Sequence, residues 1–184
     1  EIYRNSAPVG ALQVAHDIGA DPERLVVFHS LSKRSNLPGL RSGFAVSGPK
    51  NIKEMKQLRN YSGAPNPTPL QAVAAAAWSD ENHVVENRKL YQKKYQIADN
   101  IFKNIKGYNA PKAGFFLWLP VENDEQATLN LWKHSGIRVL PGSYLSRNVD
   151  NKNPGEKYIR VAMVAPFGET KLGLQTIKDN LYTL

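Results

Sequence analysis

The chain has 184 residues, no cysteine, and 24 Lys and Arg against 16 Asp and Glu, which gives a net charge of +8. Hydrophobic residues make up 41% of the sequence, enough for a folded core, and a chain without cysteine has neither disulfides nor thiol chemistry. No apolar run approaches the roughly 20 residues that span a bilayer, so we expect a cytoplasmic protein that does not bind membranes.

The positive charge is spread along the sequence. Its largest groups, in residues 50–59 and 88–94, fall at helical positions beside acidic and amide residues. This pattern is typical of a solvated helix face, and no nucleic-acid-binding motif accompanies it. We therefore expect no nucleic-acid partner, and a pocket for anionic substrates accounts for part of the excess.

The first part of the chain alternates short strands and helices. Residues 24–30 are β-branched and aromatic without alternation, which predicts a strand buried on both faces. Residues 61–69 contain three prolines and predict an irregular loop. The other expected elements are a strand end at 1–3, a short helix or turn at 8–16, a turn at 33–41, a strand at 42–47, a helix at 49–60 and an alanine-rich helix at 70–78.

A long helix is predicted from residue 81 to residue 105, with an apolar stripe that includes Tyr91, Tyr95 and Phe102. Such a helix extends nearly 40 Å and can join two domains, so we divide the chain into residues 1–80 and 81–184. After it we expect a compact α/β unit: a strand at 115–120, a helix at 124–135, a strand at 137–140, a loop at 141–157, a strand at 158–164 and a helix at 169–182.

The turn after the strand at 24–30 carries the residues with the clearest chemistry. Lys33 follows a strand expected to be buried, where desolvation favours the neutral amine that attacks a carbonyl to form a Schiff base. Arg41, eight residues later, offers a guanidinium suited to phosphate, and Ser30 and Ser32 add hydroxyls. Together these groups indicate a pocket for pyridoxal 5′-phosphate.

The string HSLSKRSNLPGLRSGF at residues 29–44 resembles the cofactor-lysine motif of the class I and II aminotransferases. One branch of that family, the N-succinyldiaminopimelate aminotransferases, is also similar in the strings at residues 60–95, 113–121, 139–147 and 153–166. The resemblance therefore extends over nearly the whole chain.

The resemblance implies an α/β fold, that of the fold-type-I transferases that depend on pyridoxal phosphate. Residues 1–80 would be the end of the large cofactor-binding domain, and residues 81–184 the long helix and most of the small C-terminal domain. Because the chain starts without Met, at what reads as a strand already under way, we expect the C-terminal part of a longer protein. The family also implies a homodimer whose substrates are amino acids and 2-oxo acids.

The family motif assigns the Schiff base and the proton transfer to Lys33, and the phosphate to Ser30 and Arg41. Ser32 is left open. Arg160 alternates with apolar neighbours in the strand at 158–164, so it faces away from them and needs an anionic partner, either a structural carboxylate or a substrate. The family places its substrate-carboxylate arginine in this strand, which favours the second alternative.

Three aromatic residues have weaker indications. Tyr3 is either a cofactor ligand or an ordinary aromatic at a strand end. Phe116 is either a core residue or a pocket residue in the strand that, in the family, faces the substrate. His29 lies beside Ser30 on the strand and either lines the pocket or, as we expect, is a core histidine with its hydrogen bonds made. The four histidines show no metal-binding spacing.

The resemblance implies an aminotransferase acting between glutamate and N-succinyl-2-amino-6-ketopimelate in lysine biosynthesis. The two alternatives are an aminotransferase with another amino-acid substrate and a non-catalytic binding or regulatory module with the same fold. We expect this chain by itself to be inactive, because the family's cofactor-stacking aromatic, its pyridine-nitrogen Asp and most of its dimer surface lie upstream of the residues that match.

Overall fold

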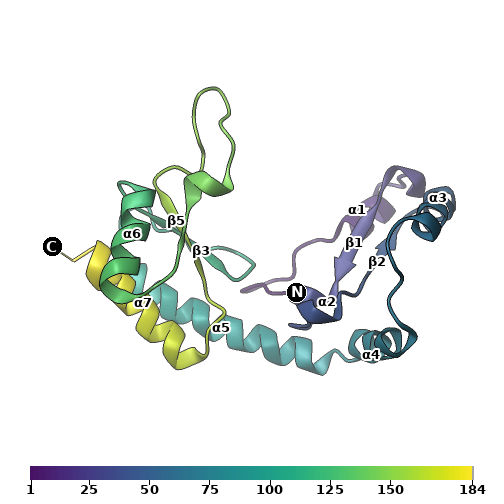
Figure 1. The fold of residues 1–184 in the computed structure, drawn as a ribbon, viewed down its shortest axis with the longest axis horizontal. Helices are drawn as coiled ribbons and strands as arrows, with labels where there is room; N and C mark the ends of the chain where they lie inside the picture. Colours follow the sequence, from purple (N-terminus) through teal and green to yellow (C-terminus); the bar gives the residue numbers. More distant parts are fainter. Residues whose placement is uncertain (184) are drawn as a thin grey trace. The chain divides into compact units, whose positions relative to one another are not determined.

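The computed structural model describes residues 1–183, which form two compact units (Figure 1). Unit 1 contains Glu1 and Ser6–Glu86, and unit 2 contains Ile2–Asn5 and the chain from Asn87 onward. The chain passes from one unit to the other inside a long helix, α5 (Asn82–Phe102). The domain boundary expected near residue 80 stays a prediction for the intact protein.

Unit 1 is built on a two-stranded antiparallel sheet of β1 (Val27–Ser30) and β2 (Gly43–Val46), in which Ser30 lies opposite Gly43. Around this sheet lie α1 (Ala11–Asp17), η1 (Pro22–Arg24), α2 (Leu31–Arg34), η2 (Pro38–Leu40), α3 (Pro49–Tyr61) and α4 (Thr68–Ser79). The helices expected at 8–16 and 49–60 are confirmed, and α4 begins within the segment expected to be a loop.

Two expectations for unit 1 are wrong. The first strand is shorter than predicted, and Phe28 within it is 74% exposed, because among the described residues β1 pairs with β2 alone and only one of its faces is covered. The segment expected to be a simple turn contains the helical turns α2 and η2. The helical turn begins at Ser30, whose hydroxyl accepts a hydrogen bond from the backbone N–H of Ser32 and so caps α2.

Helix α5 has 21 residues, about 31 Å at 1.5 Å per residue. Its predicted apolar stripe is confirmed, since Tyr91, Tyr95, Ala98 and Phe102 are all buried. Lys94, expected on the solvated face, is instead buried, with only 8% of its surface exposed. Its ammonium donates to the carbonyls of Met163 and Ala165, at 2.9 and 2.7 Å.

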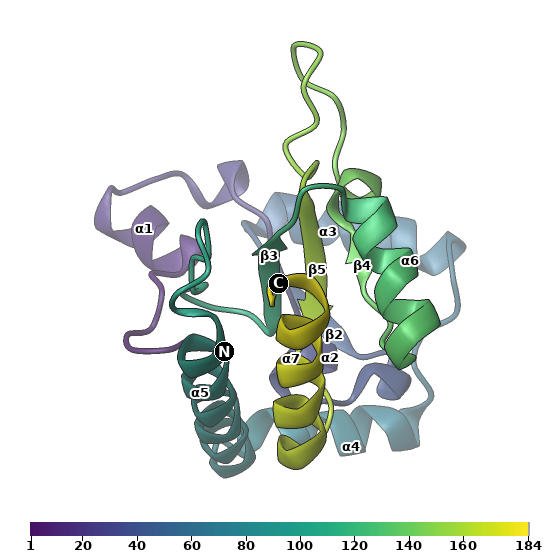
Figure 2. The same ribbon diagram turned by 90° about the vertical axis from the view of Figure 1, so that its left-hand side faces the viewer.

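Unit 2 contains a three-stranded antiparallel sheet in the order β3 (Phe116–Pro120), β5 (Tyr158–Ala162), β4 (Leu140–Pro141). Helices α5, α6 (Asp124–Ser135) and α7 (Phe167–Leu181) cover one face of this sheet (Figure 2). The core lies between the helices and that face and includes Leu117, Leu131, Ile159, Leu174 and Ile177.

The bounds predicted for α6 are confirmed, and local chemistry explains them. The side chain of Asn123 accepts from the N–H of Gln126 at 2.9 Å, and Gly136 ends the helix at φ 68°. The strand expected before residue 140 is shifted and reduced to β4, because Pro141 has no N–H with which to extend the ladder.

The expected loop at 141–157 begins with η3 (Gly142–Leu145) and then projects from its unit as a narrow loop (Figures 1 and 2). Val149 and Lys152 exchange backbone hydrogen bonds across its tip. Within residues 1–183 no helix combines the length and the apolar character that crossing a bilayer requires.

Candidate functional site

The segments that carry Ser30 and Arg41 meet at one end of the β1–β2 pair. The N–H of Leu31 donates to the carbonyl of Ser42 at 3.1 Å, so the intervening loop is closed at its base. The Ser30 hydroxyl lies 3.0 Å from that of Ser32. Gly43 permits the backbones of β1 and β2 to lie close together here, because a Cβ on this residue would lie 2.5 Å from the carbonyl oxygen of His29.

Lys33 lies on α2 with its side chain exposed, so the expected burial of this residue is wrong for the described chain. The helical turn explains why. Leu31 and Arg34, three positions apart, face inward and are 0% and 4% exposed, which turns Lys33 toward the outside. The desolvation expected for its amine is not supplied by residues 1–183.

Arg41 ends η2 in the left-handed region, with φ 51°, and its guanidinium donates to the carbonyl of Pro38 at 3.0 Å. Its side chain is exposed. Lys33, Arg41 and Ser30 therefore belong to one closed loop that offers an amine, a guanidinium and a hydroxyl.

An aromatic group lies beside this loop in unit 1. The rings of His29 and Phe44 stack with centroids 5.7 Å apart, and Trp78 lies 4.8 Å from Phe44. These rings and Arg41 line a groove of about 930 Å³ along β2. The expectation of a hydrogen-bonded core histidine is wrong, because Nδ1 of His29 is buried without a partner among the described residues.

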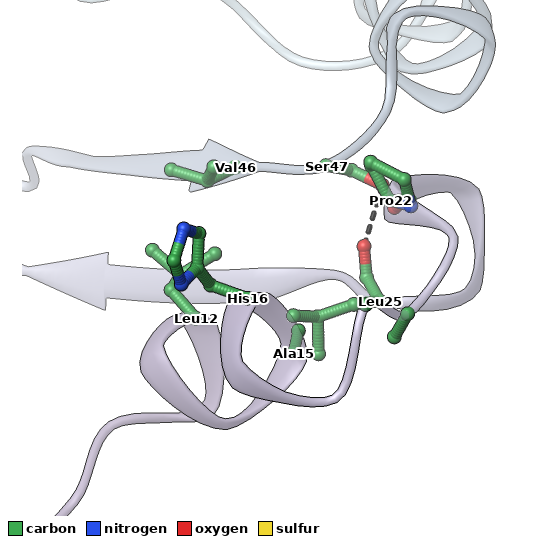
Figure 3. A pocket seen from close by; sticks show the side chains of 9 residues that line it. Leu12, Ala15, His16, Pro22, Leu25, Val46 and Ser47 are labelled. Carbon is green, nitrogen blue, oxygen red and sulfur yellow. Dashed lines mark hydrogen bonds between the residues drawn. The ribbon is translucent and has the colours of Figure 1, made fainter.

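A second hollow, of about 420 Å³, lies between α1, η1 and the end of β2 (Figure 3). Leu12, Leu25 and Val46 give it apolar walls, and the hydroxyl of Ser47 donates to the carbonyl of Leu25 at 2.6 Å. Ser30, Lys33 and Arg41 are not among the residues that line it.

Arg160 lies in β5 of unit 2 with the predicted alternation: Ile159 and Val161 are buried in the core, and Arg160 projects from the other face of the sheet. Its guanidinium carbon lies 4.2 Å from the centre of the Phe116 ring. Among residues 1–183 no carboxylate lies within ion-pair distance of this guanidinium, so the structural salt bridge is not found there.

Tyr3 pairs through its backbone with Ala113 in an isolated antiparallel bridge, and the guanidinium carbon of Arg88 lies 4.2 Å from its ring centre. These contacts all belong to unit 2. They make Tyr3 part of the packing of that unit and do not test the alternative role as a ligand.

Comparison with known proteins decides the family. A family model described as "Aminotransferase class I and II" matches residues 1–172. The chain belongs to this aminotransferase family. The resemblance of the motifs to the class I and II aminotransferases is therefore confirmed.

The solved aminotransferase most useful for comparison comes from Neisseria meningitidis. It is 40% identical, with a TM-score of 0.90, over 96% of this chain and 46% of that one. The aminotransferase AspB from Helicobacter pylori is 32% identical, with a TM-score of 0.90, over 100% of this chain and 47% of that one. These likenesses confirm the expected α/β aminotransferase fold.

Among curated relatives, LL-diaminopimelate aminotransferase from Dehalococcoides mccartyi is 29% identical over 91% of this chain and 42% of its own length. The chain thus spans about half the length of the aminotransferases it matches.

Sequence reasoning missed one residue beside the candidate site. Nothing in the sequence analysis sets Arg34 apart from the other arginines, yet it is the most deeply buried charged residue among residues 1–183. The signal available in the sequence was its spacing of three from Leu31, which places both on one side of a helical turn.

Proposed function

We propose that the intact protein is an aminotransferase that uses pyridoxal 5′-phosphate, with Lys33 as the amine that holds the cofactor. The observation that carries the proposal is the family match over residues 1–172, which includes the whole Ser30–Arg41 motif. When bound, this cofactor supplies the electron sink for the reaction at the substrate's α-carbon.

The donor set of the closed loop fits the cofactor. Phosphate is bound well by a guanidinium together with neutral hydroxyl donors, and Arg41 and Ser30 offer these groups from the two ends of the loop. Lys33, between them on α2, offers the amine that an aldehyde requires. We propose Ser30 and Arg41 as the residues that hold the phosphate.

Lys33 has a second proposed task, the transfer of a proton at the substrate's α-carbon. An amine serves as a base only in its neutral form, and exclusion of water favours that form. Because Lys33 is exposed in residues 1–183, the groups that exclude water have to come from the remainder of the intact enzyme.

Arg160 is proposed to bind the substrate's α-carboxylate. Three observations support this role: it projects from the open face of the sheet, it has no carboxylate partner among the described residues, and its guanidinium rests on the Phe116 ring. A planar guanidinium binds a carboxylate through two parallel hydrogen bonds.

The proposed substrates are glutamate and N-succinyl-2-amino-6-ketopimelate. The branch resemblance of the sequence supports them, and a relative named for LL-diaminopimelate supports the coarser assignment to diaminopimelate metabolism. An aminotransferase for another amino acid is the alternative within the family, and a non-catalytic module is the alternative outside it. A homodimeric assembly and a cytoplasmic location belong to the same proposal.

The test is reduction of the intact protein with borohydride in the presence of pyridoxal 5′-phosphate, followed by peptide mass spectrometry. We expect one phosphopyridoxyl group on Lys33, and none at that position in Lys33→Ala, which should also lose transamination. Lys53→Ala, which removes an exposed lysine of α3, is the matched control and should behave as the natural protein. An active Lys33→Ala variant would refute the assignment.

A further inference from the structure

The residue directly after Lys33 fixes the cofactor-lysine helix to the end of another helix. The Arg34 guanidinium donates to the carbonyl of Ala77 at 2.8 Å and to those of Trp78 and Asp80 at 3.4 Å each. It also forms an ion pair with Glu81. All these partners belong to the junction between α4 and α5, residues 77–83, within unit 1.

This position suits a cation for a general reason. The last carbonyls of a helix have no partners within the helix, and the helix dipole makes that end negative. Arg34 meets these carbonyls at the end of α4 and packs its guanidinium carbon 5.1 Å from the centre of the Trp78 ring. Its burial, at 4% exposure, is therefore compensated by hydrogen bonds and charge.

A second contact joins the same two segments. The hydroxyl of Ser35 lies 2.8 Å from Nε2 of His83, and Nδ1 of His83 lies 2.8 Å from the carboxylate of Asp80. Asp80 in turn accepts from the N–H of Asn82 at 2.9 Å, at the start of α5. The two residues that follow Lys33 are thus both bonded to residues 77–83.

Helix α2 depends on such contacts. It has four residues, and one isolated turn of helix is unstable in water. What holds it is the Ser30 cap at one end, the buried side chain of Leu31, and Arg34 at the other end. Since Lys33 lies between Leu31 and Arg34 in α2, any movement of the helix at Arg34 also moves the Lys33 backbone.

We propose that Arg34 is a positioning residue for Lys33. The bonds of Arg34 to residues 77–83 hold α2, and with it the Lys33 amine, at the place where that amine reacts with the cofactor. The inference rests on the proposed function, in which Lys33 binds pyridoxal 5′-phosphate. It adds a residue whose effect is transmitted through the backbone of α2, without contact to cofactor or substrate.

The experiment measures, in the intact protein, the rate at which pyridoxal 5′-phosphate becomes attached to Lys33, by borohydride quenching at timed intervals and peptide mass spectrometry. Arg34→Gln should lower this rate about tenfold or more, because misplacing a reacting group by an ångström costs up to about a hundredfold. Arg34→Lys should restore part of the rate, since it keeps the cation and one hydrogen bond. Arg24→Gln, at an exposed arginine of unit 1, is the matched control and should leave the rate unchanged.

Thermal unfolding of each variant, recorded alongside, separates positioning from stability. A rate that falls while the protein remains folded at the assay temperature supports the inference, as does rescue by Arg34→Lys. An Arg34→Gln protein that is folded and labels Lys33 at the natural rate overturns it while leaving the proposed function intact. Absence of label on Lys33 in the natural protein overturns both.

Should Arg34→Gln fail to fold, Glu81→Gln replaces it. This change removes the charge that pairs with Arg34 at an exposed position, so the fold should tolerate it. We expect a decrease of about threefold in the labelling rate, because an ion pair with an exposed partner contributes less than a buried one. An unchanged rate in that folded variant would count against the inference.

Discussion

Arg160 is the residue whose environment makes the most direct prediction about binding. Replacing it by Lys keeps the charge but loses the planar fork, so a carboxylate would be held by one hydrogen bond instead of two. In the intact enzyme we expect the KM for the amino-acid substrate to rise about tenfold to a hundredfold, corresponding to about 1.5–3 kcal/mol for a charged hydrogen bond.

Arg138→Lys is the matched control for this measurement. Arg138 also belongs to unit 2, and its guanidinium carbon also lies over an aromatic ring, 4.5 Å from the centre of Trp132. It has no place in the proposed site, and steady-state kinetics should show an unaltered KM. Equal effects of the two substitutions would argue against a carboxylate-binding role for Arg160.

The burial of Lys94 should make the free energy of unfolding depend on pH. Burial lowers the pKa of its ammonium below the usual 10.5, so between the lowered pKa and 10.5 the unfolded chain binds more protons than the folded one. The contribution of Lys94 to the free energy of unfolding therefore rises with pH in that window. At pH values below the window, the cost of keeping the buried amine charged in the folded protein does not change with pH.

Lys94→Met should abolish this rise. It should also destabilise the protein at every pH, because the carbonyls of Met163 and Ala165 lose their donor. Urea unfolding at pH 8 and pH 10 measures the free energy of unfolding of the natural protein and of Lys94→Met. Lys93→Met, which replaces the exposed neighbouring lysine, is the control. Parallel changes with pH in the natural protein and in Lys94→Met would show that this amine does not titrate as its burial implies.

At the level of single elements, the cap of α6 gives a prediction of stability. Asn123→Ala removes the side-chain acceptor for the N–H of Gln126 and should lower the free energy of unfolding by about 1 kcal/mol. Glu122→Ala, at the exposed residue before it, should have little effect. Chemical denaturation of both variants tests the difference, and equal stabilities would contradict a capping role for Asn123.

The elements that the sequence predicted well are those whose signals are local. Helix α6 has its cap and its terminal glycine within the segment itself, and the apolar stripe of α5 needs only the helical period. The alternation around Arg160 was likewise readable, because β5 has one buried and one open face. The overall α/β fold was predicted from the motifs that resemble the aminotransferase family.

The elements predicted poorly depend on contacts distant in sequence. Helix α2 looked like a turn because its stability comes from Leu31 and from Arg34, whose partners lie more than forty residues away at Ala77 and beyond. Lys94 looked like a surface lysine because its two acceptors follow β5. The burial expected for β1 and Lys33 is not found, because among the described residues β1 pairs with β2 alone and Lys33 faces outward from α2.

At the scale of the whole chain, the two units differ in how well they bury apolar surface. The main hydrophobic core lies entirely in unit 2. In unit 1 large apolar side chains remain in solvent, with Phe28 at 74% and Leu58 at 65% exposure. A two-stranded sheet is marginally stable by itself, and its open edges seek further pairing.

This difference predicts how the 184-residue chain behaves in isolation. Lys33 and Arg41 are exposed on unit 1, and the solved relatives contain about as much chain again as the part that matches. Without that remainder, water competes with Ser30 and Arg41 for the phosphate, and Lys33 stays exposed. We therefore expect weak binding of pyridoxal 5′-phosphate and no measurable transamination, while unit 2 retains the protection of a folded core in hydrogen exchange.

Titration of the isolated chain with pyridoxal 5′-phosphate, followed by borohydride reduction and mass spectrometry, tests the expectation against the intact protein. The label should spread over exposed lysines such as Lys53 instead of concentrating on Lys33, since both side chains are exposed in residues 1–183. Labelling of Lys33 alone, near one equivalent, would mean that the closed loop selects the cofactor without the rest of the enzyme. In that case positioning by Arg34 and charge at Arg41 would suffice for recognition, and the further chain that the relatives contain would be needed for catalysis only.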